Sequence, residues 1–99
     1  MCGATAGGPS TDGVDLTQES VVQGVVLREG QPVAGAYVRL LDAGGEFTAE
    51  VPTSATGQFR FFAAPGSWTV RTLAPRADTV DSSVVAAKGE VADLEILIG

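Results

Sequence analysis

Short runs rich in β-branched and aromatic residues, divided by Gly- and Pro-containing turns, constrain the fold more than any other feature of this chain. Seven such runs follow one another: SVVQGVVLR, AYVRLLD, EFTAEVP, GQFRFFAA, SWTVRTLA, TVDSSVVA and VADLEILIG. Parallel α/β folds would require helical periods between the strands, and no stretch of the chain shows a clean one. The sequence therefore predicts an all-β fold, a single antiparallel seven-stranded sandwich.

The first 19 residues have a different composition from the rest of the chain. They contain few apolar residues and show no sustained period, as expected for a segment that cannot bury a core. The remaining length suits one small domain. We therefore expect residues 1–19 to form a flexible N-terminal tail and residues 20–99 to form the sandwich domain.

Alternation along each strand predicts which side chains face the core, because successive residues point to opposite faces of a sheet. The predicted inward set is Val38, Leu40, Phe47, Val51, Phe59, Phe61, Trp68, Val70, Leu94, Ile96 and Ile98. The predicted outward set is Tyr37, Arg39, Glu46, Thr48, Glu50, Arg60, Phe62, Arg71, Asp93 and Glu95.

Composition excludes several classes of function. A net charge of −6 repels the phosphates of nucleic acid, and no apolar run approaches the length of a membrane span. The chain begins without the basic and apolar segments of a signal peptide, which favours a cytoplasmic location. It contains no His, which removes the commonest general base and metal ligand, so we expect no metal and no cofactor.

Two acidic groups are candidates for metal binding or acid–base chemistry. Asp12, Asp15 and Glu19 match no known calcium-loop spacing, and a solvated linker is the favoured interpretation. Glu46 and Glu50 alternate on one strand face, where ion pairs with arginines of neighbouring strands are favoured over catalysis. Neither group predicts an enzyme.

The stretch GVVLREGQPVAGAYVRLLD, followed by TGQFRFFAAPGSWTV, resembles the carboxypeptidase-regulatory-like domain of the transthyretin-type sandwich. The resemblance covers roughly residues 20–73 and implies the fold. Such domains serve as appendages in many settings, so the resemblance does not imply one function.

A second resemblance covers nearly the whole chain. VDLTQESVVQGVV, GAYVRLLD, EFTAEV and SATGQFRFFAAPGSWTVR, with the early Cys-Gly, are similar to the bacterial sulfur-metabolism proteins of the SseC type, a family also labelled as a domain of unknown function. This resemblance implies association with a rhodanese-type thiosulfate sulfurtransferase. It implies no established reaction.

Cys2 is the one cysteine of the chain and our candidate for carrying sulfur. We expect Met1 to be removed, which would leave an α-amine beside the Cys2 thiol and favour the thiolate that accepts sulfur. Arginine and aromatic residues are enriched at interfaces. We therefore expect one outward surface for partner binding, formed by Tyr37, Arg39, Arg60, Phe62 and Arg71. The alternative to a sulfur-carrying accessory protein is a protein-binding module without thiol chemistry. An enzyme is the third and least favoured hypothesis. The oligomeric state stays open.

Overall fold

The computed structural model describes residues 4–6 and 20–99, which form nine strands. These are β1 (Ala4–Ala6), β2 (Ser20–Arg28), β3 (Gln31–Pro32), β4 (Tyr37–Leu41), β5 (Phe47–Pro52), β6 (Gln58–Ala63), β7 (Gly66–Leu73), β8 (Val80–Ala86) and β9 (Val91–Ile98). Each of the seven predicted runs corresponds to one of the seven longer strands, and β7 begins one residue before its run, at Gly66. Strands β1 and β3 are two short additions that the sequence did not predict.

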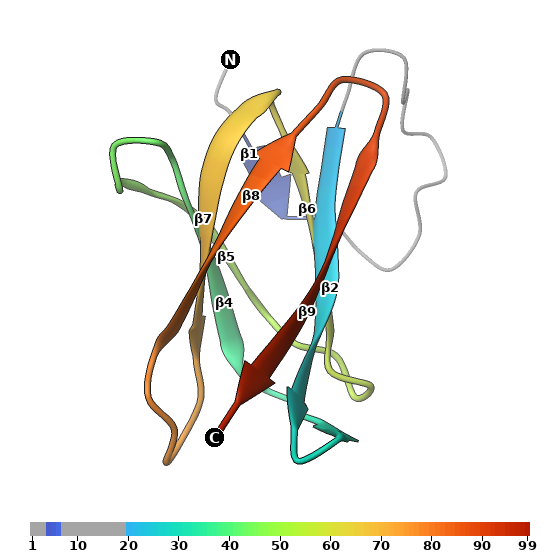
Figure 1. Ribbon diagram of the computed structural model, residues 1–99, viewed down its shortest axis with the longest axis vertical. Helices are drawn as coiled ribbons and strands as arrows, with labels where there is room; N and C mark the ends of the chain where they lie inside the picture. The colour runs from blue at the N-terminus through green and yellow to red at the C-terminus, as the bar shows by residue number, and fades with distance from the viewer. Residues whose placement is uncertain (1–3, 7–19) are drawn as a thin grey trace.

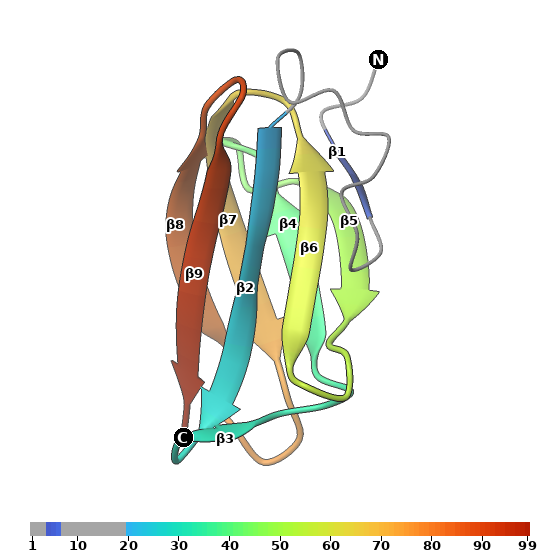
Figure 2. The same cartoon turned by 90° about the vertical axis from the view of Figure 1, so that its right-hand side faces the viewer.

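The strands form two packed sheets, which confirms the all-β sandwich (Figure 1). The first sheet has the order β1-β6-β2-β9, with β3 pairing the end of β2, and it faces the viewer in Figure 2. The second sheet has the order β5-β4-β7-β8. Among the described strands, all pairs are antiparallel except β2–β9, which is parallel. Within the described ranges, no helix is long and apolar enough to cross a membrane.

The core lies between the two sheets, as the alternation predicts. Its buried members are Val22, Val26, Val38, Leu40, Phe59, Phe61, Ala63, Trp68, Val70, Ala86, Ile96 and Ile98. Val51 and Leu94 pack against this cluster and are half-buried. The Trp68 indole donates its Nε1–H to the carbonyl of Ala64 at 2.9 Å, which satisfies the one polar atom of that side chain.

Phe47 is the exception, because the inward position predicted for it is wrong. Its side chain is 61% exposed. The register between β4 and β5 shifts at Leu40 and Leu41, so Leu40 faces Ala49 while Leu41 faces Phe47. A bulge of this kind adds one residue to one strand and reverses the alternation beyond it. The bulge therefore places Phe47 in solvent.

Side chains hold two of the connections near the second sheet. The carboxylate Oδ1 of Asp42 accepts hydrogen bonds from the backbone N–H groups of Gly44 and Glu46, at 2.9 and 3.0 Å. After β5, the buried Thr53 hydroxyl accepts from the N–H of Ala36 at 3.0 Å and donates to the carbonyl of Val33 at 2.6 Å. These bonds satisfy backbone groups that no strand partner reaches.

Candidate functional site

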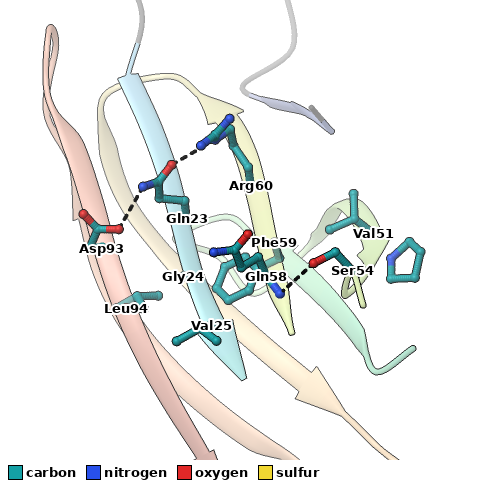
Figure 3. Close-up of a pocket in the computed structure, with 11 residues that line it drawn as sticks. Gln23, Gly24, Val25, Val51, Ser54, Gln58, Phe59, Arg60, Asp93 and Leu94 are labelled. Carbon is teal, nitrogen blue, oxygen red and sulfur yellow. Dashed lines mark hydrogen bonds between the residues drawn. The ribbon is translucent and has the colours of Figure 1, made fainter. Parts of the chain in front are cut away.

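A cavity of about 380 Å³ opens on the first sheet, beside the turn that joins β5 to β6 (Figure 3). Four strands and that turn contribute its walls. The lining residues are Gln23, Gly24, Val25, Val51, Pro52, Ser54, Gln58, Phe59, Arg60, Asp93 and Leu94. Polar side chains and apolar surface meet in this cavity, as they do in ligand pockets.

Three of these side chains form a row across the outer face of the first sheet, which we call the mixed row: Arg60, Gln23 and Asp93. Strand register brings them together, since Gln23 lies opposite Arg60 on β6 and opposite Asp93 on β9. Arg60 Nε donates to Gln23 Oε1 at 2.9 Å, and Gln23 Nε2 donates to Asp93 Oδ1 at 2.9 Å. The neutral amide thus joins a cation to an anion across three strands (Figure 3).

Gly24 lets the strands beneath the mixed row approach closely. A Cβ atom at this position would lie 2.3 Å from the carbonyl oxygen of Leu94 and 2.8 Å from the ring of Phe59. Both distances are too short for any side chain, so only glycine fits here. The glycine therefore fixes how near β9 and the Phe59 ring lie to β2 at the cavity wall.

The outer face of the second sheet carries a different row, which we call the charged row: Glu50, Arg39, Arg71 and Asp81. Cross-strand register aligns the four residues on β5, β4, β7 and β8. Arg39 Nε bonds Glu50 Oε2 at 2.6 Å. Arg71 binds both carboxylate oxygens of Asp81, at 2.9 and 3.0 Å. The two arginines are therefore neighbours in the middle, and the two carboxylates lie on the edge strands.

The bidentate pair changes the titration of both of its members. The hydrogen bond from Arg71, with a smaller contribution from its charge, lowers the pKa of Asp81 below the ordinary 3.8. The same hydrogen bond, reinforced by the charge of Asp81, raises the pKa of Arg71 above its already high value. Both side chains are exposed enough to be screened by solvent, so the pair holds geometry more than it adds stability.

The five predicted partner-binding residues do not share one surface, so that prediction is wrong. Tyr37 and Arg39 lie on β4 and Arg71 lies on β7, in the second sheet. Arg60 and Phe62 lie on β6, in the first sheet. Alternation identifies a residue's outward face but does not identify its sheet, and the connection from β6 to β7 passes from one sheet to the other. The structure therefore divides the candidates between two outer faces.

Cys2 lies outside the described residues. The structure does describe β1, which begins two residues after Cys2 in the chain and pairs with β6, Ala4 opposite Ala63 and Ala6 opposite Phe61. The chain is therefore attached to the edge of the first sheet from Ala4, within the predicted tail.

The sequence analysis did not single out Gln23 of the mixed row or Gly24, which lines the cavity beside it. Gln23 was unassigned, because a lone glutamine in a strand carries no chemical signature. Gly24 had a usable signal: a glycine inside the β-rich run SVVQGVVLR indicates close approach by another part of the chain.

The two rows carry side chains that can bind a ligand. Across residues 4–6 and 20–99, no group of three or more His, Cys, Asp or Glu side chains could hold a metal ion. The mixed row contributes hydrogen-bond donors and acceptors at a cavity, and the charged row contributes the Nη donors that Arg39 and Arg71 do not use on Glu50 and Asp81. Such side chains recognise polar or charged groups.

Fold and site together define a small β-sandwich domain with two chemically distinct outer faces. The chain belongs to a family described as proteins of unknown function (DUF1416), whose model matches residues 2–98. An uncharacterized protein of Mycolicibacterium smegmatis is 68% identical over 62 residues, which are 62% of this chain and 69% of that protein. Two uncharacterized proteins of Mycobacterium tuberculosis are 67% identical over 61 residues, and the match spans 61% of this chain and 61% of their own length.

Solved structures resemble this chain in fold alone. The minor pilin GBS52 of Streptococcus agalactiae superposes with a TM-score of 0.70 at 12% identity, covering 82% of this chain and 44% of the pilin. The dioxygenase domain of a dioxygenase carbohydrate-binding protein fusion from Streptomyces superposes with a TM-score of 0.65 at 12% identity, covering 94% of this chain and 92% of that domain. The same sandwich thus occurs in proteins of different function.

Proposed function

We propose that this chain is a non-enzymatic, cytoplasmic accessory protein of sulfur metabolism, which docks on a rhodanese-type thiosulfate sulfurtransferase and receives sulfur on Cys2. The resemblance to SseC-type proteins supplies the partner, and the family match that begins at residue 2 includes the cysteine. The two outer faces supply candidate docking surfaces with arginine and aromatic residues.

The observation that carries the proposal is the pairing of β1 with β6. β1 begins two residues after Cys2 in the sequence, and its pairing places this part of the chain at the edge of the first sheet. The cysteine is therefore close in sequence to a strand of the sandwich, which supports a role beside a docked enzyme.

The transfer step needs no oxidant. The enzyme persulfide gives up its terminal sulfur to the Cys2 thiolate, so one S–S bond breaks and one forms, and the enzyme leaves as its thiolate. Electrons and atoms balance.

Intact-mass measurement after incubation with thiosulfate and a rhodanese-type sulfurtransferase tests the transfer. The expected result is the mass of one added sulfur atom on the wild-type chain and none on Cys2→Ser. The Cys2→Ser variant should keep the fold, as monitored by circular dichroism. If the wild-type chain gains no sulfur, the carrier role is wrong.

A second measurement tests docking without thiol chemistry. Binding of Cys2→Ser to the same enzyme, combined with absence of sulfur transfer to the wild type, would support the alternative of a plain protein-binding module. Two paired variants then locate the docking face: Arg60→Ala with Phe62→Ala on the first sheet, and Tyr37→Ala with Arg39→Ala on the second. No binding by the wild-type chain would overturn both docking proposals.

A further inference from the structure

The two arginines of the charged row are placed where like charges ordinarily repel. Arg39 and Arg71 are direct cross-strand partners on β4 and β7, and both point away from the core. Side chains at such positions have Cβ atoms about 4.5–5.5 Å apart, and like charges directly opposite each other destabilise a sheet. Glu50 and Asp81 offset part of this repulsion, each from the far side of its own arginine.

The arginine donors are only partly used by the chain. Arg39 bonds Glu50 through Nε, and its terminal Nη groups make no hydrogen bond to any residue of the described ranges. Arg71 uses Nε and Nη2 on Asp81, which leaves Nη1. The Arg39 side chain is 43% exposed and the Arg71 side chain 40% exposed, so a ligand from solvent can reach both.

Tyr37 lies on the same outer face, two residues before Arg39 on β4, and is 54% exposed. Its phenol adds a neutral hydrogen-bond donor beside the two cations. A planar carboxylate is matched by a single guanidinium fork, whereas a tetrahedral oxyanion points its oxygens in several directions. It can therefore accept from the two Nη groups of Arg39 and from Nη1 of Arg71 at once.

From this arrangement we propose that Arg39 and Arg71 together bind a small tetrahedral dianion of the sulfate, thiosulfate or hydrogen-phosphate class. The ligand bridges the Nη donors that the two arginines do not use on Glu50 and Asp81. This site is on the opposite outer face from the cavity and the mixed row, and it does not depend on the proposed sulfur carrier role.

Arginine-detected NMR on the full chain tests the site, with the Nε–Hε signals of Arg39 and Arg71 as reporters and those of Arg28 and Arg76 as internal controls. Sodium sulfate and sodium thiosulfate are titrated against sodium chloride at matched ionic strength. We expect saturable shifts at Arg39 and Arg71 with the dianions, and only the common ionic-strength drift at the controls. Equal, unsaturable shifts at all four arginines would overturn the proposal.

Charge variants sharpen the test in both directions. Arg71→Gln should weaken sulfate binding by about fivefold, the size expected for one exposed charge-assisted contact. Arg76→Gln, in the loop after β7, should leave it unchanged. Glu50→Gln should strengthen binding by about threefold, because it removes a negative charge and keeps an acceptor for Arg39. Equal affinity in Arg71→Gln and wild type would contradict the site.

A second variant and a second ligand complete the test. If Arg71→Gln fails to fold, Arg71→Lys retains the charge without the fork and should bind more weakly than wild type. Phenyl phosphate distinguishes the source of the oxyanion: tighter binding than inorganic phosphate supports an anion carried on a larger ligand, and weaker binding supports a free anion. The protein is measured without any sulfurtransferase, so a negative result leaves the docking proposal standing.

Discussion

The two outer faces of the sandwich arrange similar residues to different effect. On the first sheet, Gln23 separates Arg60 from Asp93 and hydrogen-bonds to both, beside a cavity. On the second sheet, Arg39 and Arg71 are direct neighbours and their carboxylate partners lie outside them. Opposite charges are therefore joined on one face, whereas like charges are adjacent on the other. Cross-strand register, rather than composition, makes the difference.

Phe59 in the first sheet and Phe47 in the second sheet differ in burial, although alternation predicted both to face inward. The first sheet buries Phe59 and Phe61, whose ring centroids lie 6.1 Å apart, and Gly24 provides room for the Phe59 ring. The second sheet contains the bulge at Leu40 and Leu41 that leaves Phe47 outside. Phe59 is thus a core residue and Phe47 a surface residue.

Alanine substitution at the two phenylalanines tests that difference and carries the largest expected effect. Phe59→Ala should lower the free energy of unfolding by about 3–4 kcal/mol, because it leaves a cavity in a packed core. Phe47→Ala should change it by less than about 0.5 kcal/mol, since the ring is largely in solvent. Urea denaturation measures both. Similar losses in the two variants would mean that Phe47 is packed and the bulge is misplaced.

Glycine substitution tests the close approach that distinguishes the first sheet. Gly24→Ala should cost about 2–3 kcal/mol, because its Cβ would meet the Leu94 carbonyl oxygen and the Phe59 ring. Gly44→Ala is the control, in the turn between β4 and β5, with Asp42 Oδ1 at 3.4 Å as its nearest neighbour, and should cost less than about 1 kcal/mol. Chemical denaturation compares the two variants. A Gly24→Ala variant as stable as the control would show that β2 and β9 are further apart than described here.

Much of the fold was predictable from local pattern, because alternation and turn residues act within a few positions of the chain. All seven runs became strands, and the residues predicted inward, from Val38 to Ile98, lie in or against the core except Phe47. The bulge was not predictable, because it depends on how β4 pairs with β5 and leaves no signature in either strand alone.

The sites were less predictable, because they depend on which strands become neighbours. Arg39 and Arg71 were both expected outside, but their direct pairing follows from β4 lying beside β7. Arg60 was grouped with them since outward faces look alike in sequence, and it pairs instead with Gln23 on the opposite face. Residue types thus predicted arginines on the outer faces, and strand order decided which arginines became neighbours.

A pH titration addresses the charged row and carries the smallest expected effect. In the folded chain the hydrogen bond from Arg71 lowers the pKa of Asp81 below its ordinary 3.8, so folding favours the ionised carboxylate. The resulting stabilisation is present above that value and is lost as the pH falls through the lower, folded-state pKa. We therefore expect Asp81→Asn to be slightly less stable than wild type at pH 6, with the difference shrinking below pH 3.8. Urea midpoints across this range measure it, and added salt should reduce it, because the pair is exposed. If the stability difference between Asp81→Asn and wild type stays constant from pH 6 to acid, Asp81 supports the sheet through contacts other than its charge.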